Sequence, residues 1–311
     1  MSDPSIGSPE EVRLKRRATH VSVAVGVTLA LAKLAAWLIT GSVTILSSLL
    51  DSMVDVIASA ITMMTVSHSL RPPDRSHRFG HGKAEPLGAL AQAAFIGGSG
   101  LFIVFQAIDR FLDPKPPTGT SVGLAIMGVS ILLTLGLVTY QHHVVRRTGS
   151  LAIAADRLHY SGDLLTNLAV VAALGLFEYT GALWLDPLVG IAIAGYLLAN
   201  AAGIGRGAVD VLMDRELPAE DRRRIKEIVL AHDQVEGLHD LRTRSSGTTP
   251  IIALHLEVDG ELTVNQAHDI SDAVEISLRK AFPGAQITLH QEPAGLDDDR
   301  LDHIIHKKHR T

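Results

Sequence analysis

Two aspartates stand four residues apart in a stretch of the sequence that is otherwise almost wholly apolar. They are Asp51 and Asp55, within LLDSMVDVIA at 49–58. Residues at i and i+4 share one face of a helix, and a buried carboxylate without a partner is costly. The pair therefore predicts a polar helix face that lies against protein or water rather than lipid.

A second polar face of this kind occurs later in the chain. In DRLHYSGDLLTN, His159 and Asp163 are again four residues apart. Three carboxylates alone would repel one another, whereas three carboxylates and one imidazole suit a divalent cation such as Zn²⁺. Because these ligands must be deprotonated to bind metal, protons compete with it, which is a physical basis for proton-coupled metal transport. The predicted transport site is therefore Asp51, Asp55, His159 and Asp163; the alternatives are a proton relay or polar contacts between helices.

Long apolar segments must position these faces. The chain has 311 residues, of which 47% are hydrophobic, and its charges gather at the N-terminus and after about residue 206. A helix spans a bilayer with about 20 mainly apolar residues. Six segments of that length are predicted, near 20–40, 44–67, 86–108, 121–141, 150–178 and 184–205.

Lysine and arginine in the connecting loops predict the orientation. They are concentrated in the N-terminal segment and in the second and fourth loops, so both termini and the even-numbered loops are expected in the cytoplasm. A large, all-helical soluble protein is the alternative. The net charge of −5 implies no general affinity for nucleic acid. The chain has no cysteine but 15 histidines, so any metal site must use histidine and carboxylate.

The chemistry of the chain changes from about residue 207. Two amphipathic helix patterns and three alternating strand patterns follow in the order αββαβ, which predicts a small α+β domain. The fold class is thus a six-helix membrane protein with a C-terminal cytoplasmic α+β domain. The predicted parts are a cytoplasmic segment at 1–17, the membrane domain at 18–206, the α+β domain at 207–292 and a flexible, histidine-containing tail at 293–311.

Strand alternation places several histidines away from the core of this domain. In PIIALHLEVDG, Ile252, Leu254, Leu256 and Val258 form the apolar face, and His255 lies on the other face with Glu257. His290 and Glu292 are likewise neighbours on one face of the last strand. A metal site on that face is predicted, which His239 and His268 could complete; a solvated sheet face is the alternative.

Two further groups of histidines lie in polar segments. Asp74, His77 and His81 in the 71–83 loop form Asp-x2-His-x3-His, which can bind Zn²⁺ with a water as fourth ligand. His303, His306 and His309 recur every third residue in the C-terminal tail and could collect metal weakly. In both segments, solvated side chains are the alternative.

Several motifs together resemble one family, the cation diffusion facilitators. They are DSMVDVIAS, HYSGD, HRFGHGKAEPLGALAQA, and LMDRELP followed by HDLRTRSSG. The likeness covers about residues 15–292 and is strongest to bacterial ferrous-iron/zinc efflux pumps. It implies a homodimeric metal/proton antiporter of the bacterial inner membrane, with six spans and a metallochaperone-like cytoplasmic domain that mediates dimerisation. In that family, histidine at the place of His159 accompanies a preference for Zn²⁺ and Cd²⁺.

The resemblance also implies sites outside the membrane. It places a second metal at the loop residues and a binuclear zinc site at His239, His255, His268, His290 and a bridging aspartate, where this chain has Glu292. Lys83 and Asp214 match a salt-bridge pair between the two domains. Zn²⁺ is thus expected both as the transported ion and as a structural or regulatory ion.

Three other functions compete with zinc efflux. A membrane metalloprotease would need a motif such as His-Glu-x-x-His, which the sequence lacks. A membrane-anchored metal sensor would use the α+β domain but leave the membrane site without a purpose. A member of the same family that prefers Mn²⁺ or Fe²⁺ differs only in its substrate.

Overall fold

The computed structural model describes residues 8–113, 121–180 and 184–295. The described residues form two compact units, and each is considered by itself. The membrane unit comprises 9–71 and 83–210, and the C-terminal unit comprises Ser8, 72–82 and 211–295. The 72–82 loop thus belongs to the C-terminal unit, although it joins two helices of the membrane unit.

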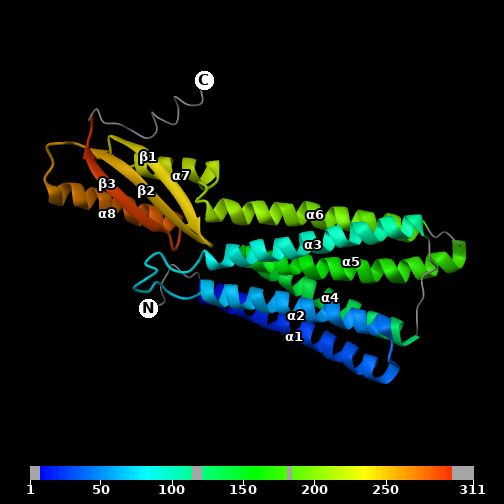
Figure 1. Cartoon of the computed structure of the whole chain (residues 1–311). Coiled ribbons are helices and arrows are strands. Elements are labelled where there is room, and N and C mark those ends of the chain that lie inside the picture. The colour runs from blue at the N-terminus through cyan, green and yellow to red at the C-terminus, as the bar shows by residue number, and fades with distance from the viewer. Residues whose placement is uncertain (1–7, 114–120, 181–183, 296–311) are drawn as a thin grey trace. The chain divides into compact units, whose positions relative to one another are not determined.

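The membrane unit consists of six long helices that lie alongside one another (Figure 1). At a rise of about 1.5 Å per residue, even the shortest exceeds the bilayer's hydrocarbon core of about 30 Å. The helices are α1 (Pro9–Thr40), α2 (Val43–Ser69), α3 (Ala84–Leu112), α4 (Ser121–Thr148), α5 (Leu151–Thr180) and α6 (Leu185–Leu212).

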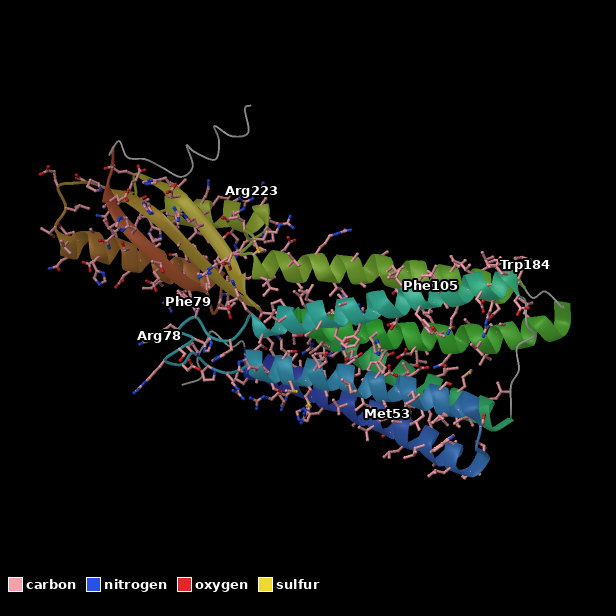
Figure 2. All side chains as sticks on the ribbon, viewed as in Figure 1. Met53, Arg78, Phe79, Phe105, Trp184 and Arg223 are labelled. Atoms are coloured by element: carbon pink, nitrogen blue, oxygen red, sulfur yellow. The ribbon has the colours of Figure 1, made fainter. Side chains whose placement is uncertain are left out.

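The outer surface of this unit is apolar. Within the described residues, five helices (all but α5) are long and apolar enough to cross a membrane. Helix α5, with 30 residues, is long enough to cross a membrane, but it carries the polar stretch that ends at Asp163. Met53 and Phe105 lie on the outside of the bundle, with exposed fractions of 51% and 71% (Figure 2). A surface with so many exposed large apolar side chains faces lipid, so the predicted six-helix membrane part is confirmed.

Close packing and a buried ion pair hold the helices together. A Cβ atom at Gly88 would overlap the Thr65 side chain, so glycine permits the close approach of α2 and α3. Lys15 of α1 and Glu85 of α3 form a buried pair at 2.9 Å. Removing one partner of such a pair leaves an uncompensated charge, which is strongly destabilising.

The C-terminal unit has the predicted order αββαβ. Its elements are α7 (Ala219–Leu230), β1 (Gly237–Ser246), β2 (Thr249–Val258), α8 (Val264–Ala281) and β3 (Gln286–Pro293). The sheet order is β1-β2-β3, with β1 antiparallel and β3 parallel to β2. The predicted small α+β domain is therefore confirmed.

Both helices cover one face of this sheet (Figure 1). The predicted apolar face of β2, from Ile252 to Val258, is buried against α7 and α8. A capping box fixes the start of α8, since the Thr263 side chain accepts from the Gln266 backbone and the Gln266 side chain accepts from Thr263. The opposite face of the sheet, which carries His255, is left for polar side chains.

Three membrane helices extend by seven or more residues beyond the predicted spans, and one of them is α6, which continues to Leu212 instead of ending near 205. Helix α1 begins at Pro9 instead of near 20, and α4 continues to Thr148 instead of ending near 141. The predictions measured only the apolar run, whereas a helix keeps its own hydrogen bonds and can continue past the hydrocarbon region.

Candidate metal sites

The two predicted polar faces in the membrane meet between α2 and α5. His159 Nε2 lies 2.9 Å from Asp55 Oδ1 and 3.9 Å from Asp163 Oδ2. One ligand atom from each of the three residues lies within 4.8 Å of the others. Asp163 Oδ2 is buried without a hydrogen-bond partner. Three ligand atoms thus converge where a cation would provide the missing partner.

Asp51 stands slightly apart from this group. It lies one helical turn before Asp55 and is exposed. Its carboxylate interacts electrostatically with Asp55, but it is not among the three residues whose ligand atoms converge. The four-ligand site therefore stays a prediction, of which the structure brings three members together.

A lysine that the sequence reasoning missed lies beside these carboxylates. Lys33 of α1 donates from Nζ to Ser52 Oγ at 2.6 Å and to the Ser48 carbonyl oxygen at 3.1 Å. Its ammonium interacts electrostatically with all three aspartates of the predicted site. A single lysine in an apolar segment is often a snorkelling side chain, and only the packing of α1 on α2 reveals its position.

A second buried carboxylate, Asp156, joins α5 to four other helices. Its Oδ2 accepts from Ser22 Oγ at 2.5 Å and Gln141 Nε2 at 2.6 Å. Its Oδ1 accepts from Ser59 Oγ at 3.1 Å and Gln92 Nε2 at 3.2 Å. Asp156 is the first residue of the stretch DRLHYSGDLLTN, and the sequence gives no sign of its partners, which come from α1, α2, α3 and α4.

We expect Asp156→Leu to destabilise the membrane unit. The change removes the acceptor that four buried donors share. Gln141 Nε2 then has no acceptor among the described residues, whereas Gln92 Nε2 keeps Ala58 O and Thr62 Oγ1. A buried donor without an acceptor costs about 1–3 kcal/mol, so the midpoint of thermal unfolding in detergent should fall by several degrees. Asp156→Asn keeps one carbonyl acceptor, so its unfolding midpoint should lie between those of Asp156→Leu and the parent. Exposed Asp109 offers the matched control Asp109→Leu. Equal unfolding of Asp156→Leu and the control would contradict a structural role of these bonds.

Three histidines form a row across the sheet of the C-terminal unit. The register pairs His239 with His255 and His255 with His290, and it pairs Glu257 with Glu292. Cross-strand neighbours on one face have Cβ atoms about 5 Å apart, so the strands themselves bring the imidazoles together. The ring centroids of adjacent histidines lie 4.9 and 4.8 Å apart.

Glu292 is central to this row. Its Oε1 lies 2.7 Å from His255 Nδ1 and 3.2 Å from His290 Nε2, and its Oε2 lies 3.2 Å from His239 Nε2. His255 Nδ1 and Glu292 Oε2 are buried, and neither makes a hydrogen bond. Unbonded nitrogen and carboxylate oxygen at such distances suit a Zn²⁺ site. A bound ion would cross-link the three strands through these side chains.

Glu257 orients one of these histidines. Its Oε1 lies 2.7 Å from His239 Nδ1, an arrangement that fixes the tautomer of a metal-binding imidazole and raises its basicity. The sequence placed Glu257 beside His255 on the polar face but did not identify this role.

We expect Glu257→Gln to weaken zinc binding at the sheet. Outer-shell partners of this kind contribute about 10–100-fold to metal affinity. In calorimetric titration of the full-length Glu257→Gln protein, one class of zinc sites should have an affinity lowered by that factor. In His239→Ala, this class of sites should be absent. Exposed Glu261 provides the control Glu261→Gln. Unchanged zinc affinity in Glu257→Gln would contradict this assignment.

His268 does not join the row in this chain. It lies on α8 with an exposed side chain, and its Nε2 is 3.6 Å from Asp272 Oδ2. The structure therefore brings together His239, His255, His290 and Glu292, whereas the five-residue binuclear site stays a prediction. The tail histidines His303, His306 and His309 lie outside the described residues.

The three residues of the predicted loop site lie close together within the C-terminal unit, and metal binding there stays a prediction. Asp74 Oδ1 lies 3.3 Å from His77 Nδ1, and Asp74 Oδ2 lies 3.3 Å from His81 Nε2. The backbone N–H of His77 donates to Asp74 Oδ1 at 2.7 Å, and this hydrogen bond is the main reason that the pKa of Asp74 is lowered. The aspartate is thus held as the anion that metal binding requires.

Packing on the sheet positions this loop. Gly82 meets the β1–β2 turn so closely that a Cβ atom there would overlap the Ser246 backbone. The Arg244 guanidinium lies 5.2 Å from the centroid of the Phe79 ring and 3.1 Å from Asp214. Because Asp214 and Lys83 belong to different units, their predicted salt bridge stays a prediction.

The chain matches known proteins over nearly its whole length. Residues 19–213 match the family described as the cation efflux transmembrane domain, and 217–294 match the cation efflux protein cytoplasmic domain. The chain is 44% identical over 286 residues to cation-efflux pump FieF of Pectobacterium carotovorum, covering 92% of this chain and 95% of that protein. It is 43% identical over 280 residues to FieF of Shewanella oneidensis, covering 90% and 94%.

Among solved structures, a chain of the transporter CzrB is 38% identical and covers 25% of this chain and 99% of its own, with a TM-score of 0.25. The metal-bound C-terminal domain of the CzcD transporter from Thermotoga maritima is 24% identical and covers 26% and 100%, also with a TM-score of 0.25. The family matches together span nearly the whole chain. The chain therefore belongs to the cation efflux family of membrane transporters, the cation diffusion facilitators that its motifs resemble.

Proposed function

We propose that this protein exports divalent metal ions from the cytoplasm in exchange for protons. Zn²⁺ is the main substrate, and Cd²⁺ and Fe²⁺ are further substrates. The observation that carries this proposal is the convergence of Asp55, His159 and Asp163 between two membrane helices. A cluster of ionisable side chains within membrane-spanning helices is typical of an ion path. The mixed nitrogen and oxygen ligands favour Zn²⁺ over the harder cation Mn²⁺.

Protons and metal alternate at the same atoms in this mechanism. Metal from the cytoplasm binds when His159 is neutral and the aspartates are ionised, and Asp51 supplies the fourth ligand. Protons that arrive from the outer side take the same atoms, so the metal leaves. A ligand bound better by one conformation shifts the balance between inward-open and outward-open states.

Lys33 completes the charge balance of the site. Three aspartates contribute three negative charges, a divalent ion contributes two positive charges, and Lys33 contributes the last. The loaded site is then neutral, which favours its presence in surroundings of low dielectric constant. After metal release, the ammonium still offsets part of the carboxylate charge.

The protein is proposed to act as a homodimer in the bacterial inner membrane, with both termini in the cytoplasm. The match of 217–294 to a cytoplasmic domain supports this orientation. So does the concentration of Lys and Arg in the N-terminal segment and the even-numbered loops. The names of the relatives, cation-efflux pumps, support the direction of transport.

Purified protein reconstituted in vesicles tests this function. With a zinc-sensitive dye inside, zinc uptake should be fast when the lumen is acidic and slow when the gradient is collapsed. Addition of Cd²⁺, Fe²⁺ and Mn²⁺ as competitors should rank the substrates, with Mn²⁺ the weakest. A rate of zinc uptake that does not depend on the proton gradient would rule out the exchange of zinc for protons.

A further inference from the structure

A cavity of about 530 Å³ lies between α4, α5 and α6, and none of its lining residues is a candidate metal ligand. Apolar side chains such as Val138, Leu158 and Ile204 form part of its wall, and Arg157 and His142 supply its basic groups. None of its lining residues is acidic. Neither the transport of a cation nor the packing of the helices accounts for an arginine at this place.

Arg157 has a neutral partner instead of a carboxylate. Its Nη1 lies 2.6 Å from His142 Nδ1. A guanidinium only donates, so His142 Nδ1 accepts and the imidazole is neutral, with its Nε2–H left as a donor. Among the described residues, the interaction found for the Arg157 guanidinium is this one with His142, and no carboxylate pairs with it. The cavity therefore holds one uncompensated positive charge and several N–H donors.

Arg157 lies near the boundary between the acyl chains and the lipid headgroups. Arg157 follows the first residue of α5, Leu151, by six positions, which is about 9 Å along a helix. A helix of 30 residues is about 45 Å long and exceeds the hydrocarbon core of about 30 Å by about 7 Å at each end. The guanidinium thus lies close to the boundary between acyl chains and headgroups.

Along the sequence, this end of the helix bundle is followed by the C-terminal unit. Helix α6 ends at Leu212, directly before the residues that match a cytoplasmic domain. Helix α4 ends and α5 begins within three residues of each other, at Thr148 and Leu151. His142 and Arg157, the basic groups of the cavity, each lie six positions from these ends of α4 and α5, whereas the lining residues of α6 lie farther from its end. The basic groups thus lie toward the cytoplasmic leaflet, where anionic lipids attract positive charge.

We infer that the cavity binds the phosphate of an anionic phospholipid of the cytoplasmic leaflet. The planar guanidinium of Arg157 matches two phosphate oxygens. His142 Nε2 and the Tyr196 hydroxyl are further donors at the lining, and the apolar wall accommodates the start of the acyl chains. An anion also offsets the cost of an arginine at this depth. A divalent cation would be repelled, so the cavity is no part of the metal path.

Lipid retention by the full-length protein tests this inference. Protein is reconstituted with mixed phosphatidylglycerol and phosphatidylcholine, extracted gently, and its bound lipid counted by native mass spectrometry. The parent should retain phosphatidylglycerol in preference to phosphatidylcholine, and Arg157→Gln should lose about tenfold of that preference. Arg157→Lys should keep most of it. Arg206→Gln removes an exposed arginine of α6 outside the cavity and should behave as the parent.

Several results would contradict the binding of an anionic lipid in the cavity. Equal retention of the two lipids by the parent, or unchanged preference in Arg157→Gln, would overturn the inference. If inorganic phosphate alone raises the unfolding temperature of the parent but not of Arg157→Gln, the site binds a free anion and the lipid assignment is wrong. Should Arg157→Gln fail to fold, His142→Gln must show a reduced preference, and parental behaviour of that variant would also overturn it.

Discussion

Vesicles that contain Asp55→Asn should take up zinc at least about 100-fold more slowly than vesicles with the parent protein. The amide has the shape of the carboxylate but not its charge, so the site loses an anionic ligand whose oxygen lies 2.9 Å from His159 Nε2. His159→Ala should have an effect of similar size because it removes the only nitrogen ligand. Initial rates with an acidic lumen provide the measurement.

The control for this prediction is Asp109→Asn, in an exposed position on α3. It should transport zinc as the parent does. Comparable amounts of folded protein in each vesicle sample exclude a trivial loss. A rate for Asp55→Asn close to that of Asp109→Asn would show that zinc does not pass through this cluster.

Replacement of Lys33 should change the kinetics in a different way. In Lys33→Met, the loaded site carries a net negative charge and the empty site carries one more negative charge than before. The metal is then held more tightly, because a unit charge and a divalent ion about 10 Å apart interact by about 3 kcal/mol at an effective dielectric constant of about 20. Both KM for zinc and the maximal rate should fall, by about tenfold or more, because release becomes slow.

Two variants separate charge from packing at this position. Lys33→Arg keeps the charge and should retain most of the transport rate. Ser52→Ala removes the hydrogen bond at 2.6 Å but leaves the ammonium, so KM should change little. If Ser52→Ala lowers the rate as much as Lys33→Met, the lysine serves to join α1 and α2 rather than to balance charge.

The sequence predicted the elements well because their patterns are local. The apolar segments are long enough to identify all six membrane helices, and the alternation from Ile252 to Val258 identified the buried face of β2. The start of α1 and the ends of α4 and α6 lie outside the predicted apolar spans, since a helix continues beyond the lipid without an apolar pattern. No local pattern marks such an end.

The parts of the sites that depend on packing were beyond the sequence. Spacing selected Asp55 together with Asp51, and His159 together with Asp163, because the two residues of each pair lie on one helix face. It could not show that Lys33, from another helix, lies beside them. Nor could it show that Gln141 and its three counterparts converge on Asp156, because a buried glutamine has no distinctive spacing.

In the C-terminal unit, strand alternation placed His255 and His290 on the face away from the core, and pairing between strands then decided their partners. The register brings His239, His255 and His290 into one row, which a single sequence does not specify. Glu257 could have been suspected, since it lies two residues after His255 on the same face. His268 was predicted to complete the site, both from its position in the chain and by resemblance, and its place on α8 lies outside the row.

The most direct test of metal/proton exchange records both ions in one experiment. Vesicles with a pH-sensitive dye and a zinc-sensitive dye inside start at equal pH on both sides, and zinc is added outside. We predict that the lumen becomes alkaline with the same time course as zinc entry, because each entering metal ion is exchanged for protons that leave. Neither signal should change with Asp55→Asn. Zinc entry at the parent's rate without any change in luminal pH would contradict the exchange of metal for protons.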